Sequence, residues 1–251
     1  MKILVLASGS KGNSTYIEYK NTKILIDLGI SSLSLDKKLK EINVSSDELD
    51  AVLITHTHVD HVGGLKTFTK KHNVPIYLSD IMYDELGLPL TNHKFIDNNK
   101  LIINDIEIDI IKTSHDTNDS MGFVIKADKE LVYITDTGYI NKKYFKNIYD
   151  KDIYIFESNH DLEMLIDGKY PYYLKQRILG DKGHLSNKDS AYYLSKLTGN
   201  HTSHIVLAHL SEDNNTEEKA LNSLYSALKR ENKHINNIMV ANQKESILIE
   251  V

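Results

Sequence analysis

Cysteine is missing from the 251 residues of this chain. Its absence excludes disulfide bonds, thiolate metal sites and cysteine nucleophiles together. It also fits a reducing compartment, and we expect a cytoplasmic protein. Any metal ion that the chain binds must therefore be held by nitrogen and oxygen ligands.

Long apolar runs are missing as well. The first residues, Met1–Ala7, carry one lysine and an apolar stretch that is too brief for a signal peptide and far too brief to span a bilayer. With 3 prolines, 12 glycines, 41% hydrophobic and 26% charged residues, the composition is that of an ordinary globular protein. We expect one domain over residues 1–251, without membrane attachment, and nothing in the sequence implies an obligate protein partner.

A surplus of positive charge is also absent, because the formal net charge is −5. Proteins that bind a polyanion usually carry a basic excess, so the surface as a whole is not expected to attract nucleic acid. A local basic patch is compatible with this balance. Any affinity for nucleic acid must then come from a limited region.

Short β-branched runs alternate with helical patterns from end to end of the chain. We expect strands at Lys2–Ala7, Thr15–Tyr19, Lys23–Asp27, Ala51–Thr55, Ile76–Leu78, Glu107–Lys112, Gly122–Ala127, Leu131–Thr135, Asp152–Phe156, Ile205–Ala208, Asn237–Ala241 and Ile247–Val251. We expect helices at Ser31–Ile42, Gly64–His72, Pro171–Leu179, Asn187–Leu197 and Thr216–Glu231. The interleaving predicts an α/β fold with sheets covered by helices. The apolar stripe of the last helix can be a partner surface, although packing against the core is its ordinary use.

A cluster of imidazoles and one carboxylate follows the apolar run Ala51–Thr55. It places His56, His58, Asp60 and His61 within six positions. Imidazole and carboxylate together suit Zn²⁺, Mn²⁺ or Fe²⁺, and a loop that leaves a buried strand can hold such side chains still. A solvated loop that is merely rich in histidine is the alternative, but this spacing belongs to the specific short motifs. We predict a metal site here.

Further candidate ligands stand just beyond three other predicted strands, at His115, Asp136 and His209. A single histidine at a strand end is usually only hydrogen-bonded, and Asp136 can also be the N-cap of a following helix. Two ions, however, need more ligands than the histidine-rich loop supplies. We therefore expect all three residues to join that loop, with Asp136 bridging two cations through its two oxygens.

Five short segments resemble, in order, the successive motifs of the metallo-β-lactamase superfamily. They are Leu25–Asp27, His56–His61, Ser114–Asp116, Thr135–Thr137 and Ala208–Leu210. The resemblance implies a four-layer αββα sandwich with the active site at one edge.

The resemblance also implies how two divalent ions would share the ligands. One ion would be held by His56, His58 and His115, the other by Asp60, His61 and His209, with Asp136 between them. The same resemblance gives Asp27 the task of orienting the ligands, although an aspartate before Gly29 can also simply form a turn.

Two branches of the superfamily do not fit these residues. The antibiotic-degrading branch uses a cysteine ligand, and this chain has none. The diiron, oxygen-reducing branch typically has glutamate at the position of His58. Hydrolysis remains as the expected reaction.

Three more segments are similar to the YycJ/WalJ group, namely Leu6–Ser14, Phe156–Asp161 and Gly183–Asn187. That group consists of bacterial cytoplasmic enzymes described as 5′-to-3′ exonucleases acting on DNA. The resemblance implies a phosphodiester substrate, with DNA expected rather than RNA, although the small residues of the first segment can also form a plain hairpin turn.

The chemistry of such a substrate agrees with two metal ions. Two cations roughly 4 Å apart can hold a bridging hydroxide as nucleophile and neutralise the attacking and leaving oxygens. The chain must add an acid for the leaving group and donors for the flanking phosphates. We name Asp60, through its metal, and His184 as catalytic residues, with Lys11, Asn13 and His160 as substrate-binding candidates; either of these two histidines can instead be a satisfied structural residue.

Aromatic and basic residues mix in Tyr170–Arg177, just before His184. Such a segment can stack on bases and follow a phosphate backbone, which makes Lys175 and Arg177 further substrate-binding candidates. Tyrosines at helical spacing can equally cover the edge of a core.

Two other functions stay open from the sequence. A hydrolase of small thioesters or lactones would use the same two metal ions, with attack on a carbonyl carbon. A binding module without catalysis is the third reading, and the complete set of ligands argues against it. Turnover of phosphate esters, as opposed to thioesters and lactones, discriminates between the two enzymes.

Overall fold

The computed structural model describes residues 1–97 and 99–251. Over these residues the strands form two sheets of seven strands each. The first sheet has the order β14 (Ile247–Glu250), β1 (Lys2–Ala7), β2 (Ser14–Tyr19), β3 (Thr22–Ile26), β4 (Ala51–Leu53), β5 (Ile76–Leu78), β6 (His93–Phe95). The second has the order β13 (Asn237–Val240), β12 (His204–Ala208), β11 (Ile153–Glu157), β10 (Glu130–Ile134), β9 (Met121–Lys126), β8 (Ile106–Lys112), β7 (Lys100–Ile103).

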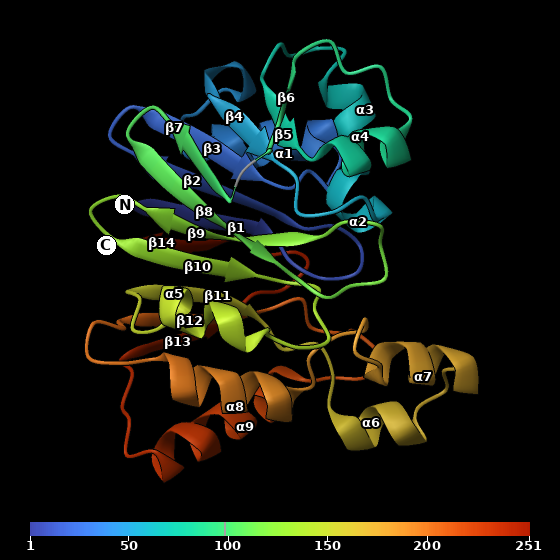
Figure 1. The fold of residues 1–251 in the computed structure, drawn as a ribbon, viewed down its shortest axis with the longest axis vertical. Coiled ribbons are helices and arrows are strands. Elements are labelled where there is room, and N and C mark those ends of the chain that lie inside the picture. Colours follow the sequence, from blue (N-terminus) through green and yellow to red (C-terminus); the bar gives the residue numbers. More distant parts are fainter. Residues whose placement is uncertain (98) are drawn as a thin grey trace.

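Helices cover the outer face of each sheet, so that the layers run helix, sheet, sheet, helix (Figure 1). On the first sheet lie α1 (Ser32–Lys40), α3 (Leu65–Phe68) and α4 (Asp80–Leu86), with the short α2 (Val59–Val62) at its edge. On the second lie α5 (Phe145–Ile148), α8 (Asn187–Leu197) and α9 (Glu217–Arg230). The expected αββα sandwich is confirmed. No helix in the described residues is long and apolar enough to cross a membrane.

Strand alternation divides the core into two parts. In β10, Leu131 and Tyr133 belong to the cluster between the sheets, whereas Val132 and Ile134 belong to the cluster beneath α8 and α9. Because successive side chains of a strand point to opposite faces, a strand covered on both faces must be apolar throughout. This explains the continuous apolar runs in β10, β11 and β12 of the second sheet.

The carboxyl ends of several strands meet at one edge. Strands β3 and β4 are parallel, as are β10, β11 and β12, and β8 runs in the same direction as β10 because both are antiparallel to β9. The residues that follow these strands therefore share one end of the sandwich. The seven predicted metal ligands are among them.

Three of those residues bend the chain sharply. Asp27, Asp136 and His209 follow β3, β10 and β12 with φ values of 59°, 52° and 57°. A residue with a side chain enters this left-handed region only at a cost, and aspartate and histidine are among those that tolerate it best. The sharp turns keep these side chains at the edge of the sheets.

Most elements lie within a few residues of their predicted bounds, but some expectations were wrong. The helix expected at Gly64–His72 is only the short α3, and a separate turn of helix, α2, stands before it. The two are separated at Gly64, where the chain passes so close to Ile30 that an added Cβ would lie 2.1 Å from the Ile30 carbonyl oxygen. Strands β6 and β7 and helices α4, α5 and α6 (Leu162–Asp167) were not expected. Each has seven residues or fewer, too few for a period to stand out.

Residues 160–187, which we call the insertion, contain α6 and α7 (Tyr172–Leu179). Figure 1 shows these two helices side by side beyond the end of the second sheet, apart from α8 and α9. Pro171, expected as the first helical residue, is the N-cap of α7. The insertion thus stands at the edge where the strand ends meet.

Candidate metal centre

The loop after β4 brings together the residues of the histidine-rich motif. His56 and His61 are buried, with 1% and 0% of their surface exposed, and His58 begins α2 as its N-cap. Because α2 is a single turn, Asp60 and His61 fold back beside His56, and the rings of His56 and His61 lie 4.0 Å apart. A polar, solvated loop would not bury two imidazoles in this way.

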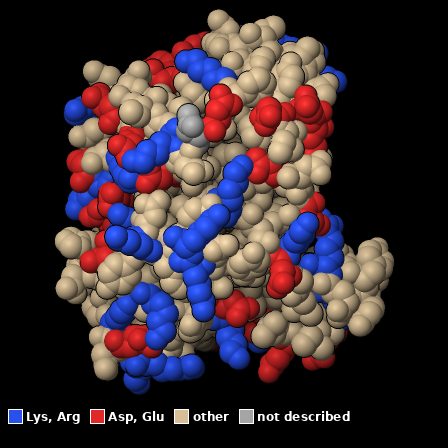
Figure 2. Space-filling model, in the orientation of Figure 1, with Lys and Arg blue, Asp and Glu red and all other residues tan. Residues whose placement is uncertain are grey.

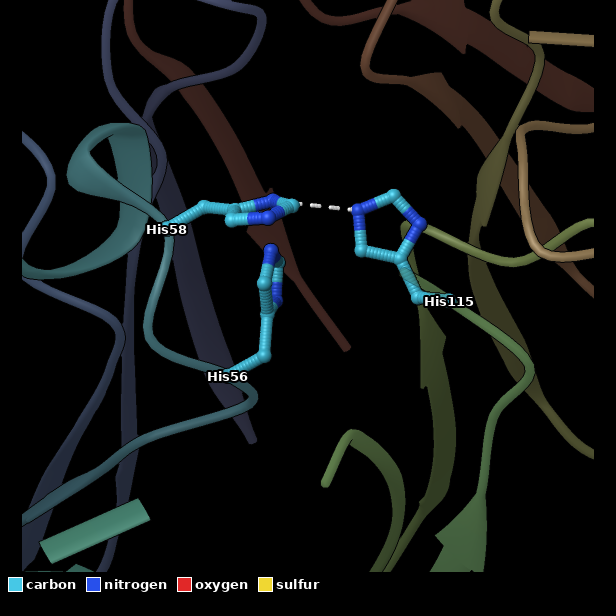
Figure 3. Close-up of side chains that lie close together, drawn as sticks. All are labelled: His56, His58 and His115. Atoms are coloured by element: carbon cyan, nitrogen blue, oxygen red, sulfur yellow. Dashed lines mark hydrogen bonds between the residues drawn. The ribbon is translucent and has the colours of Figure 1, made fainter. Parts of the chain in front are cut away.

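Three imidazoles from both sheets form the first cluster (Figure 3). His56 and His58 follow β4 of the first sheet, and His115 follows β8 of the second. Their ring centres lie 4.8, 4.9 and 5.0 Å from one another, and His58 Nδ1 lies 3.2 Å from His115 Nε2. Nitrogens of all three rings are close enough to share one ion.

The second cluster consists of Asp60, His61 and His209. Asp60 Oδ2 lies 3.4 Å from His209 Nε2 and 3.5 Å from His61 Nε2. Burial favours a neutral carboxyl, but hydrogen bonds from His209 and His61 outweigh it and hold the pKa of Asp60 far below its usual range. Asp60 is therefore an anion that faces two imidazoles.

Asp136 lies between the two clusters. Its Oδ2 is 3.2 Å from His61 Nε2, and its Oδ1 is 3.4 Å from His209 Nε2 and 3.8 Å from His115 Nε2. Burial opposes its charge, yet the nearby His209 and His61 hold the pKa of Asp136 well below its usual value. One carboxylate thus faces ligand candidates of both clusters.

Asp27 holds the ring of His61 from behind. Its Oδ2 lies 2.7 Å from His61 Nδ1, and Thr55 donates to both Asp27 oxygens, from its amide and from its hydroxyl, at 2.8 Å each. A carboxylate at Nδ1 favours the tautomer that keeps its lone pair on Nε2, the atom facing Asp60 and Asp136. Asp27 therefore both forms the turn after β3 and contacts His61.

Glu157, which sequence reasoning did not select as a site residue, lies at the end of β11 with none of its surface exposed. It accepts from the backbone amides of Thr137 at 2.9 Å and Leu185 at 3.2 Å. Burial raises its pKa, but the charge and hydrogen bond of His184 outweigh this and lower the pKa of Glu157 to about 2. A carboxylate at the end of an apolar strand was the available signal, the same one that marks Asp27 and Asp136.

His184 reaches the site from the loop after α7. Its Nδ1 lies 2.7 Å from Glu157 and 3.7 Å from Asp136, and its ring stacks on His209 with centres 5.3 Å apart. It also lines a pocket of about 270 Å³ that opens beside the first cluster. The other lining residues are Ser10, His115, Asp116, Asn159, Tyr170, Leu174, Arg177, Ile178, Gly183 and Ser211.

Comparison with known proteins decides the family. The family profile of the "Beta-lactamase superfamily domain" matches residues 22–210. Exodeoxyribonuclease WalJ of Streptococcus pneumoniae strain D39 is 38% identical over 228 residues, which cover 87% of this chain and 85% of that protein. Exodeoxyribonuclease YycJ of Bacillus anthracis is 36% identical over 231 residues, or 89% of this chain and 88% of that protein. This chain belongs to the metallo-β-lactamase superfamily, in the WalJ/YycJ group.

The solved structures agree with this assignment to the superfamily. The metallo-β-lactamase fold protein YhfI from Bacillus subtilis superposes with a TM-score of 0.75 over 98% of both chains, at 17% sequence identity. At that identity the likeness shows the fold alone. The resemblance stated from the motifs is confirmed, for the superfamily and for the group.

The superfamily and the cluster together indicate a site for divalent metal, and the side chains fit one. Four ligand atoms about 2.1 Å from a shared ion lie roughly 3.4 Å from one another, close to the separations of 3.2 to 3.8 Å around Asp136. His56 Nε2 is buried and has no hydrogen-bond partner among the described residues. Burial lowers the pKa of His56 well below its usual value, which favours the neutral imidazole that binds metal.

Unlike the predicted metal ligands, the five residues expected to bind substrate do not lie together. Of the five, Arg177 lines the pocket, where its Nε pairs with Asp116. Lys11 is exposed and pairs with Glu212. The Nζ of Lys175 donates to the carbonyls of Ile166 and Gly168 at the end of α6, at 2.5 and 2.7 Å.

Asn13 and His160 are both buried, with 1% of their surface exposed. Asn13 Nδ2 lies 3.0 Å from His61 Nε2 and 3.3 Å from Asp60 Oδ2, so it touches ligand candidates of the second cluster rather than the pocket. His160 pairs through its backbone with Ser186 in an isolated bridge and does not line the pocket. The structure therefore brings neither side chain to a surface where substrate could bind.

Proposed function

We propose that this chain is a metal-dependent exonuclease that hydrolyses DNA from the 5′ end, acting in the cytoplasm as a single domain over residues 1–251. The observation that carries the proposal is the identity of 36–38% to two exodeoxyribonucleases over most of the chain. The buried His/Asp cluster supports it, because it supplies the ligands that phosphodiester hydrolysis by metal ions requires. We propose DNA rather than RNA as the substrate because both relatives are named exodeoxyribonucleases.

In this proposal two divalent ions, of Zn²⁺, Mn²⁺ or Fe²⁺, occupy the two clusters. His56, His58 and His115 would hold one, Asp60, His61 and His209 would hold the other, and Asp136 would be a ligand of both. When bound, such ions would supply a water of lowered pKa and positive charge for the leaving oxygen. Because there is no thiolate ligand to favour one of these metals, the metal that binds depends on which one the cell supplies.

His184 is the proposed general acid for the leaving oxygen. It lines the pocket with 19% of its side chain exposed, within hydrogen-bond distance of Glu157 and close to Asp136. Glu157 fixes the ring through Nδ1, which leaves Nε2 to carry the proton that the leaving group takes up. Glu157 thus acts as a positioning residue.

The insertion supplies the proposed path for the DNA strand. On α7, Tyr172 and Tyr173 are 77% and 75% exposed, so they do not cover a core edge. Arg177 on the same helix lines the pocket. Exposed aromatic rings beside a basic residue can stack on bases of a single strand and contact its phosphates. Figure 2 shows basic and acidic side chains mixed over one face of the molecule, which agrees with a contact limited to part of the surface.

An end-labelled cleavage assay tests the proposal. Single- and double-stranded DNA and RNA with a 5′ phosphate are incubated with the protein and Mn²⁺ or Zn²⁺, and Asp60→Ala serves as the blank. Stepwise release from the 5′ end of DNA, absent in the blank, is the expected result. Metal-dependent hydrolysis of thioesters or lactones, with no cleavage of DNA, would contradict it.

A further inference from the structure

His58 presents its two ring nitrogens to different neighbours. Its Nδ1 lies 3.2 Å from His115 Nε2 and so faces the first cluster. Its Nε2 lies 3.6 Å from Asp116 Oδ1. Unlike His56 and His61, the ring is partly exposed, with 32% of the side chain open to solvent. Packing alone therefore holds His58 less firmly than its neighbours, and another group must fix its orientation.

Asp116 is placed to do this. It follows His115 directly, and its Oδ1 is buried without a hydrogen-bond partner among the described residues. Its Oδ2 accepts from Nε of Arg177, which comes from α7. Asp116 belongs to none of the groups of potential ligand atoms that lie within 4.8 Å of one another in the described part of the chain. That Oδ1 lies 3.4 Å from His115 Nε2 as well as 3.6 Å from His58 Nε2, so it faces both imidazoles.

We infer that Asp116 is a positioning residue for His58, and that Arg177 holds the Asp116 carboxylate in place. This inference rests on the metal site of the proposed function and not on the DNA substrate. A carboxylate opposite Nε2 favours the tautomer with hydrogen on Nε2 and a lone pair on Nδ1, the atom that faces the first cluster. Residues that act on ligands in this way commonly change metal affinity by about 10- to 100-fold.

Arg177 adds a link between the site and the insertion. Its side chain is 54% exposed, and an exposed ion pair contributes little stability of its own. Its effect on the site is therefore one of orientation, through the single carboxylate that it holds. The residue predicted to bind phosphate thus also connects α7 to the first cluster.

Metal affinity measured without substrate tests the inference. Mn²⁺ is titrated against a chelator of known affinity for the unchanged protein, Asp116→Asn, Arg177→Gln and the double variant. Asp116→Asn is expected to weaken the binding of one of the Mn²⁺ equivalents by about 10- to 100-fold. Arg177→Gln should weaken the binding of the same equivalent by a smaller factor. The double variant should match Asp116→Asn, because Arg177 acts only through Asp116. The control is Asp119→Asn, on the same loop, whose carboxylate pairs with Lys112 at 2.6 Å and should not affect Mn²⁺ binding.

The visible absorption of the Co²⁺-loaded protein gives a second readout, since it reports the geometry of the ligands. A changed spectrum in Asp116→Asn with both equivalents retained supports positioning. Unchanged affinity and spectrum would overturn the inference. Complete loss of one Mn²⁺ equivalent in Asp116→Asn, the result expected for His58→Ala, would also overturn the inference, because Asp116 would then be a ligand itself. Normal Mn²⁺ binding by the unchanged protein without cleavage of DNA would refute the nuclease and leave this inference standing.

Discussion

One oxygen of Glu157 lies 2.7 Å from Nδ1 of His184 and 3.3 Å from Nδ1 of His209. A single buried carboxylate therefore orients both the proposed acid and a proposed metal ligand. The two histidines also stack on one another. Changes at Glu157 should consequently affect both catalysis and metal binding, whereas changes at His184 should affect catalysis alone.

His184→Ala is expected to slow DNA cleavage by about 10²- to 10⁴-fold, the usual contribution of a general acid, while both metal ions stay bound. Glu157→Gln should slow cleavage and also weaken metal binding, because His209 loses its anionic partner. Cleavage rates at saturating DNA and metal content by elemental analysis measure the two effects. Equal metal loss in both variants would contradict the separation of roles.

Asp136→Ala and Asp60→Ala are each expected to abolish cleavage and lower the metal content. Asp136 touches both clusters, so its removal should affect both ions, whereas Asp60 belongs to the second cluster. Elemental analysis per chain, beside the end-labelled assay, checks this. Asp84→Ala, at an exposed carboxylate of α4, is the matched control. Full activity in Asp136→Ala would refute its place between the ions.

The fold was predictable where the chain repeats a simple pattern. The buried strands are apolar on both faces, and β1, β5 and α8 have the bounds that were predicted. The break between α2 and α3 was not predictable, because it depends on how closely Gly64 approaches Ile30, a residue of another segment. Short elements such as β6, with three residues, show no period at all.

The cluster was predictable for a different reason. The motif from His56 to His61 is local, and residues after parallel strands must meet at one sheet edge. Contacts to substrate depend instead on the exposure and partners of each side chain. Asn13, for example, resembles a donor in a flexible loop, but the structure buries it against His61. Glu157 stands at the end of an apolar strand, as Asp27 and Asp136 do, but it was missed because that position alone does not show which carboxylates join the site.

Tyr172 and Tyr173 test the path of the DNA strand. Stacking contributes about 1–3 kcal/mol per base, so Tyr172→Ala with Tyr173→Ala should weaken binding of single-stranded DNA by at least about tenfold. The effect should fall on KM and leave kcat nearly unchanged, because neither ring lines the pocket. Fluorescence anisotropy with labelled DNA and steady-state kinetics measure it. Tyr225→Ala, at a half-exposed tyrosine of α9, should behave like the unchanged protein; a similar loss there would mean that the effect is not specific to α7.

His160 predicts how stability depends on pH. Burial lowers the pKa of His160 from 6.5 to about 4. Between these values the unfolded chain binds a proton that the native protein does not. The contribution of His160 to the free energy of unfolding is therefore complete above pH 6.5 and is lost as the pH is lowered towards 4. The shift corresponds to roughly 3 kcal/mol, at 1.36 kcal/mol per pKa unit.

Urea unfolding at a series of pH values in this range measures the dependence on His160. His160→Gln cannot take up the proton, so its free energy of unfolding should fall less steeply between pH 6.5 and 4 than that of the unchanged protein, whatever its absolute stability. His234→Gln, at an exposed histidine, should retain the full slope. Identical slopes in the unchanged protein and His160→Gln would show that His160 is protonated equally well in both states, and that burial does not keep it neutral.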